Sequence, residues 1–208
     1  MLGIKESAEE KSHASLLTVF IRDLLKESGT EAGQLDAVAV SKGPGSYTGL
    51  RIGVSAAKGI AYGAGIPLIA IASTRIMFHG ALETGKYDYY CPMIDARRME
   101  VYSAVFNNKG EEIKEISAEI ISKDSFAEIM DKGKVLFFGD GAAKCSNIII
   151  HPSASFDLSF SISSGYMCHP AAVAFRNKAF EDVAYFEPFY LKDFIATIPR
   201  KNILGRKK

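Results

Sequence analysis

The chain has 208 residues, of which 48% are hydrophobic, and its formal net charge at pH 7 is +1. This apolar content supports a proper core in one large or two small domains. The balanced charge excludes a global positive field for binding nucleic acid. Three cysteines without any Cys-x-x-Cys spacing favour reduced thiols and a cytoplasmic protein. Because no apolar run in the sequence is long enough to span a bilayer, we expect no membrane partner.

The first predicted helix runs from Ser12 to Glu27, with Ser12 as its N-cap and Gly29 as its stop. Its apolar residues are Leu16, Leu17, Phe20, Ile21, Leu24 and Leu25. They cover about half of the circumference, more than the stripe of roughly 100° that one contact with a core requires. Two interpretations remain open. Either the helix is set deeply in its own core, or its sheet covers one side and a partner covers the other.

A glycine-rich turn follows a buried-strand pattern over residues 35–40 and opens a second helix, Thr48 to Tyr62. Such a turn can hold an anion because the free helix N–H groups point out of it. However, the glycine spacing is one residue off the dinucleotide motif, no Gly-Lys-Ser/Thr follows, and Pro44 lacks an N–H. A tight turn that lets the helix approach the sheet is therefore favoured over phosphate binding. The candidate phosphate-loop positions are Gly43, Gly45, Ser46 and Thr48.

One face of the second helix carries small residues at four-residue steps, namely Gly49, Gly53, Ala57, Ala61 and Gly65. Each interior glycine costs about 1 kcal/mol relative to alanine, so a soluble helix tolerates them only if something packs against its backbone. An adjacent, partly apolar face carries Ile52, Ala56 and Ile60. The pattern predicts a groove that a neighbouring helix can approach closely.

The remaining pattern predicts an α/β protein with two lobes. A strand over 67–71 and a helix over 73–83 complete a β-α-β-α order, which implies a parallel sheet with right-handed crossovers. After residues 84–86 the pattern becomes antiparallel. The expected elements there are strands over 89–94, 100–106, 111–121, 135–138 and 156–162, and helices over 122–131 and 170–182. We therefore expect one lobe over residues 1–87 and a second over 88–208, ending in a basic tail.

Residues capable of chemistry are sparse. No metal site is expected, because no His-x-x-x-His pair occurs among the isolated His13, His79, His151 and His169. No Gly-x-Ser-x-Gly elbow marks a nucleophilic serine. Asp95 and Asp140 each end a strand pattern, where catalytic carboxylates often lie. Two arginines follow Asp95, which favours a turn held by ion pairs and backbone bonds. Asp140 lies between two glycines and can equally accept hydrogen bonds from N–H groups of the turn.

Five segments together resemble the TsaB (YeaZ) family, in order along nearly the whole chain: 12–17, 43–53, 57–59, 94–98 and 187–192. The resemblance implies a two-lobed fold of the actin/sugar-kinase type, with each lobe built on a ribonuclease-H-like sheet. It also implies a non-catalytic scaffold that supports the TsaD subunit. That subunit forms threonylcarbamoyladenosine in tRNAs that read codons beginning with A.

The resemblance further implies the partners and the interface. TsaD binds the family through two helices, matched here by residues 12–27 and 48–62, and TsaE joins a larger complex. ATP and metal belong to the partner subunits, so no cofactor is expected in this chain, and tRNA is a partner only indirectly. Without TsaD, the same surfaces imply an isologous homodimer. The implied interface residues are Leu16, Leu17, Phe20, Ile21, Leu24, Gly49, Ile52, Gly53, Ala56, Ala57 and Ile60.

TsaD carries a His-x-x-x-His metal pair on the helix matched by residues 73–83. Aligning the two sequence patterns places Ser73 and Met77 at the positions of the two histidine ligands, and neither residue can replace a histidine ligand.

One departure from the family concerns the start of the chain. Family members begin with a strand, a turn and a second strand, and this chain lacks that hairpin. We therefore expect a truncated first lobe, with the strands of Val38 and Ile69 exposed along an edge.

Two other functions are considered. The first is a nucleotide-dependent kinase-like or glycoprotease-like enzyme that uses Asp95 or Asp140, with phosphate at residues 43–49. The second is a tRNA-binding module that uses the basic tail over 200–208, although a solvated tail is favoured there.

Overall fold

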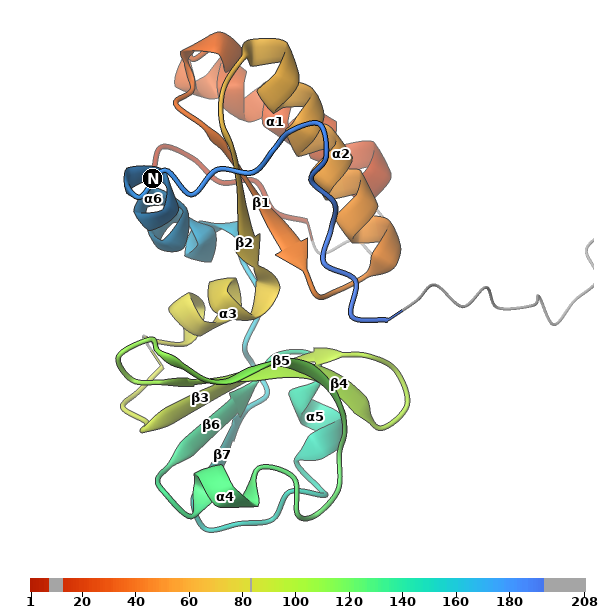
Figure 1. The fold of residues 1–208 in the computed structure, drawn as a ribbon, viewed down its shortest axis with the longest axis vertical. Helices are drawn as coiled ribbons and strands as arrows, with labels where there is room; N and C mark the ends of the chain where they lie inside the picture. Colours follow the sequence, from red (N-terminus) through yellow and green to blue (C-terminus); the bar gives the residue numbers. More distant parts are fainter. Residues whose placement is uncertain (8–12, 83, 193–208) are drawn as a thin grey trace, which may run out of the picture.

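The computed structural model describes residues 1–7, 13–82 and 84–192. These residues form two lobes, with α3 (Ser73–Ala81) at their junction (Figure 1). The first lobe contains α1 (His13–Ser28), η1 (Ala32–Gln34), β1 (Val38–Gly43), α2 (Tyr47–Ala64) and β2 (Leu68–Ala72). As predicted, β1 and β2 are parallel, with Val38 opposite Leu68.

The second lobe is built on a five-stranded sheet with the order β5-β4-β3-β6-β7, the ribonuclease-H-like arrangement that was expected. Its strands are β3 (Tyr89–Asp95), β4 (Glu100–Asn107), β5 (Glu112–Ile120), β6 (Val135–Phe138) and β7 (Ala154–Asp157). The β3–β4 and β4–β5 pairs are antiparallel, whereas β3–β6 and β6–β7 are parallel. Two short helices, α4 (Ala127–Met130) and α5 (Ala142–Cys145), complete this lobe.

The core of the first lobe lies on both faces of its small sheet. On one face, α2 packs against β1 and β2 through Val40, Val54, Ala57, Ala61 and Leu68. On the other face, Ile69, Ile71 and Ile76 pack against η2 (Ser164–Met167) and α6 (Cys168–Arg176). The sheet is therefore enclosed between two helical layers, and α6 comes from a distant part of the sequence.

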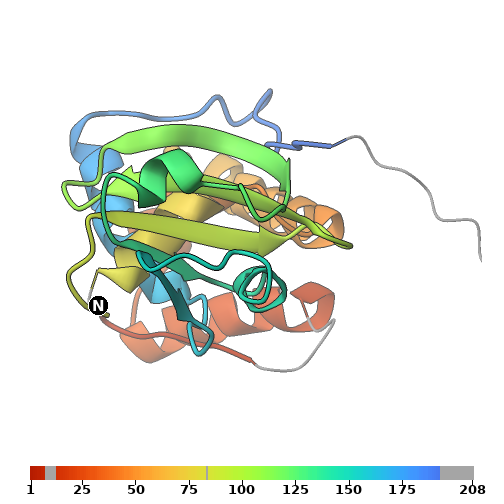
Figure 2. The same ribbon diagram turned by 90° about the horizontal axis from the view of Figure 1, so that it is seen from below.

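The chain passes from α3 to β3 of the second lobe, but it does not stay in that lobe. After α6, residues 181–192 form a segment, here called the C-terminal strap, that runs along the first lobe. The Glu181 N–H donates to Leu68 O at 2.8 Å, and Lys58 Nζ donates to the carbonyls of Ala184 and Phe186 at 3.1 and 2.9 Å. Seen from below, the strap and α1 lie on opposite sides of the molecule (Figure 2).

Several predicted elements are shorter in the structure. The helix expected over 122–131 is reduced to α4, because Phe126 has a left-handed φ of +63° just before it. The helix expected over 170–182 ends at Arg176, and Lys178 then has a φ of +54°. The helix α5 was not predicted. The expected N-cap Ser12 and the basic tail lie outside the described residues. Within the described ranges, no helix has the length and hydropathy to cross a membrane.

The open edge expected in the first lobe lies on β1. In the second lobe, β6 lies between β3 and β7, and all four of its residues are buried. In the described residues β1 pairs only with β2, and just Val40 and Gly43 of this strand are buried. The expectation covered the strand of Ile69 as well: β2 pairs only with β1 among the described strands, although the side chain of Ile69 is itself 2% exposed beneath the helical layer. The strap residue Glu181 also bridges to β2 at Leu68.

Candidate functional site

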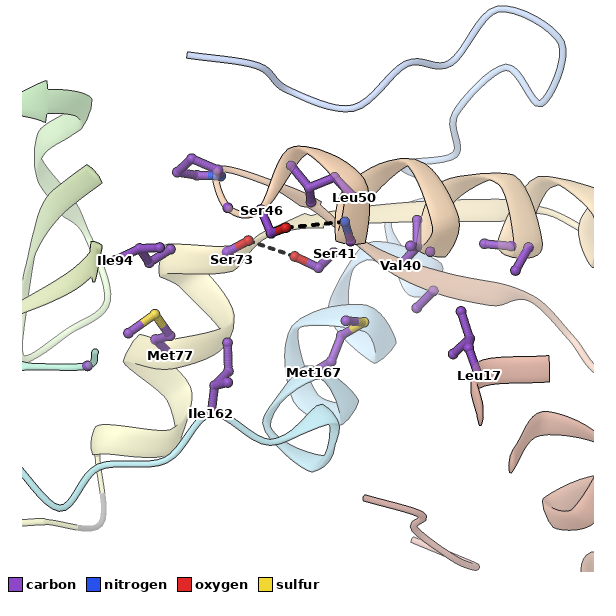
Figure 3. A pocket seen from close by; sticks show the side chains of 18 of the residues that line it. Leu17, Val40, Ser41, Ser46, Leu50, Ser73, Met77, Ile94, Ile162 and Met167 are labelled. Atoms are coloured by element: carbon purple, nitrogen blue, oxygen red, sulfur yellow. Dashed lines mark hydrogen bonds between the residues drawn. The ribbon is translucent and has the colours of Figure 1, made fainter. Parts of the chain in front are cut away.

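A cavity of about 600 Å³ opens along the edge of β1 and reaches the junction of the two lobes (Figure 3). Its first wall is the small-residue face of α2, together with Leu17 and Ile21 of α1. Met77 of α3 and Met167 of η2 line the opposite side. Its far end is closed by the carboxyl ends of β3 and β6, at Ile94 and at Gly139 and Asp140. The cavity is mostly apolar and brings together most of the predicted functional positions.

The glycine-rich turn at the mouth of this cavity is built around the strap. Gly43 has a φ of +110°, and a Cβ atom there would lie only 2.7 Å from the carbonyl oxygen of Phe189. The Phe189 N–H donates to Lys42 O at 2.7 Å. Gly45, in contrast, has no positive φ, and a Cβ atom at that residue would have nothing within 4 Å. The first glycine is therefore required by a backbone contact within the chain.

The start of α2 offers few free donors for an anion. Ser46 is the N-cap, its Oγ accepts the Gly49 N–H at 3.4 Å, and its carbonyl accepts the Leu50 N–H at 2.9 Å. Pro44 has no N–H, and Thr48 is exposed to solvent. The carboxylate-bearing Asp140 lines the same cavity, and a like charge opposes a phosphate there. The geometry agrees with the tight-turn interpretation and disfavours a bare phosphate.

The strap is anchored to the glycine-rich turn by aromatic contacts. The rings of Tyr47 and Tyr190 lie 4.9 Å apart, and Arg51 donates to the Tyr47 hydroxyl at 3.0 Å. Burial, followed by the neighbouring Tyr47, raises the pKa of the Tyr190 phenol. Sequence reasoning identified both segments but missed that they meet. The available signal was that both segments carried the family resemblance.

Asp95 and Asp140 are brought together by the parallel pairing of β3 with β6, but in structural roles. The Asp95 N–H donates to Asp140 Oδ1 at 3.0 Å, and Asp95 Oδ1 accepts the Arg97 N–H at 2.7 Å and a hydrogen bond from Lys144. Burial acts to raise the pKa of Asp95. The hydrogen bonds from Lys144 and from the Arg97 N–H, together with the positive charges of the Lys144 and Arg97 side chains, outweigh burial and lower this pKa. The interpretation of Asp95 as part of a turn held by an ion pair and backbone bonds is confirmed, although the ion pair comes from Lys144, and Arg97 contributes its backbone N–H.

The two positions matched to metal ligands in TsaD serve packing instead. Ser73 Oγ lies 2.7 Å from Ser41 Oγ, and a hydrogen bond joins β1 to the start of α3. Met77 is 2% exposed and lies against Gly139, where a Cβ atom would also approach Met93 O to 2.5 Å. Among the residues with described placement, no group of three or more His, Cys, Asp or Glu side chains could hold a metal ion.

The helix α1 is only loosely covered. All of its predicted interface residues are half-buried, and from Ser15 to Ser28 no side chain of this helix is buried. The interpretation of a helix set deeply in its own core is therefore wrong. The physical reason is that β1, the strand next to α1, has no further strand at its edge in the described residues. Apolar surface on Leu16, Leu17, Phe20, Ile21 and Leu24 remains available.

The small residues of α2 divide into two groups. Ala57 and Ala61 are 6% and 1% exposed, and they are part of the core between α2 and the sheet. At Gly53 a Cβ atom would meet only Val40 Cγ2, at 3.9 Å, and at Gly49 it would meet only Ser46, at 3.5 Å. These are ordinary contacts, so the packing of the chain does not demand glycine at either position. Ile52, Ala56 and Ile60 are half-buried.

The two-lobed fold and the glycine-rich turn at its cleft agree with the comparisons to known proteins. The family model described as "TsaD: tRNA N6-adenosine threonylcarbamoyltransferase" matches residues 3–205. Among individual relatives, the tRNA threonylcarbamoyladenosine biosynthesis protein TsaB of Haemophilus influenzae is 30% identical, and the match covers 95% of this chain and 86% of the relative. The chain therefore belongs to the TsaB (YeaZ) family, within the wider family that the TsaD model describes.

Two solved structures support the same fold. YeaZ from Pseudomonas aeruginosa superposes with a TM-score of 0.71 at 25% identity, over 86% of this chain and 85% of that one. A second structure, described as an uncharacterized protein with similarity to peptidase YEAZ from the same organism, has a TM-score of 0.79 at 24% identity. It covers 89% of this chain and 87% of its own. The predicted actin/sugar-kinase-like fold class is confirmed.

Proposed function

We propose that this chain acts in the formation of threonylcarbamoyladenosine in tRNA as a non-catalytic subunit that binds a TsaD-type transferase through α1 and α2. The pathway follows from family membership, because the curated relative is named for that biosynthesis. The non-catalytic role and the partner go beyond what the names state. They rest on how the described side chains are used.

The observation that carries the proposal is the unused surface of the two helices. The apolar residues of α1 are only partly buried, so completing their burial would add a part of the about 1.5–3 kcal/mol that full burial of one such side chain is worth. At Gly49 and Gly53 a Cβ atom would have only ordinary contacts, with Ser46 at 3.5 Å and with Val40 at 3.9 Å, so the chain's own packing does not require glycine there. A partner helix that contacts both features would bury the apolar surface and use the close approach that glycine permits.

The ion pair and hydrogen bonds that the candidate catalytic residues make within the chain support a non-catalytic role. Asp95 is paired with Lys144 and its lowered pKa keeps it ionised, so it is a poor general acid. Asp140 accepts the Asp95 N–H, and Ser73 hydrogen-bonds to Ser41. On this proposal, ATP and metal act on the partner subunits, TsaE joins the assembly, and tRNA is met through the complex. Alone, the chain would pair with a second copy through the same helices.

The experiment is a binding titration with the TsaD protein of the same organism. Phe20 and Ile52 suit the test because both are half-buried and neither is part of the described core clusters. Phe20→Asp and Ile52→Asp should each weaken the complex about ten- to hundredfold, the loss of one buried apolar side chain. Thr18→Asp and Ser55→Asp are the matched controls on exposed positions of the same helices, and they should bind normally.

Two outcomes would contradict the proposal. If Phe20→Asp and Ile52→Asp bind TsaD as tightly as the controls do, the helix pair is not the interface. If the isolated chain turns over ATP, or forms the modified nucleoside without TsaD, then the enzymatic alternative is correct and the subunit is catalytic.

A further inference from the structure

A second cavity, of about 610 Å³, lies on the opposite side of α3 from the inter-lobe cavity. Three elements meet there: the α3 residues Arg75 and His79, the β4–β5 turn with Lys109, and the start of α6 with His169. Its apolar floor includes Ile71 and Val173. None of these residues has a part in the proposed function.

The position of Arg75 and His79 on α3 is informative. Almost all of this helix is buried, including Ile76, Met77 and Phe78 at 2% exposure each. Arg75 and His79 lie four residues apart on its one half-exposed stripe, so both side chains extend toward the same surface. A helix that is otherwise core thus directs two potentially cationic groups into one cavity.

The two histidine rings lie in contact at one side of the cavity. The centroids of His79 and His169 are 5.0 Å apart, tilted by 46°. No hydrogen bond joins either imidazole to another group in the described part of the chain. The pKa of His79 is lowered by its burial, then by His169 and by Arg75, so this ring lies in a positive field. An anion bound beside the two rings would relieve that field and accept hydrogen bonds from their N–H groups.

The charges around the cavity favour an anion over a metal cation. Arg75 and Lys109 line it, and no Asp or Glu is among its described lining residues. The carboxylate of Glu112 on β5 is paired with Arg75 at 3.5 Å. Two imidazoles alone can bind a transition metal weakly, but the neighbouring cations oppose a second positive charge.

We infer that this cavity, bounded by Arg75, His79, Lys109 and His169, binds a phosphate group. The imidazolium groups and Lys109 would donate to the phosphate oxygens, and Arg75 would add positive charge while it holds the turn through Gly110 O. The apolar floor can contact the sugar or base of a nucleotide. Binding would strengthen as the pH falls through the histidine range, because the protonated rings bind the anion.

The test is an NMR titration of the four histidines of the full chain, with His151 as an internal reference. Inorganic phosphate should raise the pKa of His79 by about one unit and shift the resonances of His169, whereas sodium chloride at matched ionic strength should not. Adenosine monophosphate and a short oligouridylate are the further arms. Tighter binding of the mononucleotide than of phosphate would assign the floor to a nucleoside, and tighter binding of the oligomer would assign the site to an RNA backbone.

Variants make the result specific. Lys109→Ala and His169→Gln change exposed residues and should each weaken phosphate binding about tenfold, the loss expected for one charge-assisted hydrogen bond. Lys132→Ala removes an exposed lysine elsewhere in the second lobe and should have no effect. The inference is overturned if phosphate leaves the pKa of His79 unchanged, if chloride reproduces the shift, or if Zn²⁺ binds at this pair while phosphate does not. Loss of TsaD binding has no bearing on it.

Discussion

Replacing Gly43 with alanine tests whether the glycine-rich turn exists to hold the C-terminal strap. The φ of +110° at this residue is a conformation that L side chains rarely adopt, and a Cβ atom would lie 2.7 Å from Phe189 O. The neighbouring Phe189–Lys42 backbone hydrogen bond lies in the same contact. Gly45, two residues later, has neither constraint, so Gly45→Ala is a matched control within one turn.

The magnitude follows from two costs. Forcing a non-glycine residue into such a backbone conformation costs about 1–3 kcal/mol. Moving Phe189 away from the new methyl group would break one backbone hydrogen bond, worth about 1 kcal/mol. Gly43→Ala should therefore lower the free energy of unfolding by about 2–4 kcal/mol, a large share of the roughly 5–15 kcal/mol of a typical domain. Gly45→Ala should stay within about 0.5 kcal/mol of the parent chain.

Urea unfolding followed by far-UV circular dichroism is the suitable assay, because the chain has no tryptophan for fluorescence. With a slope of about 2 kcal/mol per molar urea, Gly43→Ala should move the midpoint down by about 1–2 M. Equal losses at Gly43 and Gly45 would refute the reasoning, since the turn would then need glycine for a reason other than the strap. A loss below about 0.5 kcal/mol at Gly43 would do the same.

Two further predictions concern ion and hydrogen-bond partners. Lys58→Met should cost about 1–3 kcal/mol of unfolding free energy and make the strap more susceptible to limited proteolysis, because two strap carbonyls lose their charged donor; equal proteolysis of parent and variant would contradict this. Since the folded-state pKa of Asp95 lies below its ordinary 3.8, its stabilisation is present above that value and is lost as the pH falls through the folded pKa. Lys144→Met should therefore flatten the loss of stability from about pH 5 to about pH 3 in pH-dependent urea unfolding, and an unchanged slope would rule out this ion pair as the cause.

Much of the fold is encoded by local patterns that a sequence displays directly. The strand before Gly43, the helix that starts at Tyr47 and the strands of the second lobe all follow from periodicity and turn residues. The lobe assignment of α6 and the strap could not be predicted in this way. Their position depends on contacts such as Glu181 with Leu68, between residues far apart in the sequence, and nothing local specifies such a contact.

The candidate site, like the fold, was predictable only where local sequence patterns specify it. Part of the lining of the inter-lobe cavity was singled out from the sequence, Gly49 and Gly53 by glycine spacing and Leu17 and Ile21 by an apolar arc, because these are local signals. Which of them face inward was not predictable, as Ala57 illustrates: its spacing matches that of Gly49 and Gly53, yet it packs in the core. The histidine pair also escaped notice, because His79 and His169 lie on separate helices and meet only when α6 returns to the first lobe.

The helix α3 lines both cavities, and it presents different side chains to each. Its residues Ser73 and Met77 face the inter-lobe cavity, where they contribute a hydroxyl bonded to Ser41 and a buried thioether. Its two ionisable side chains, Arg75 and His79, lie on the other side. A cleft lined in this way suits a subunit whose contribution is its shape and the helices beside it. If such a chain recognises a charged ligand, the recognition should occur away from the cleft, at the cationic cavity.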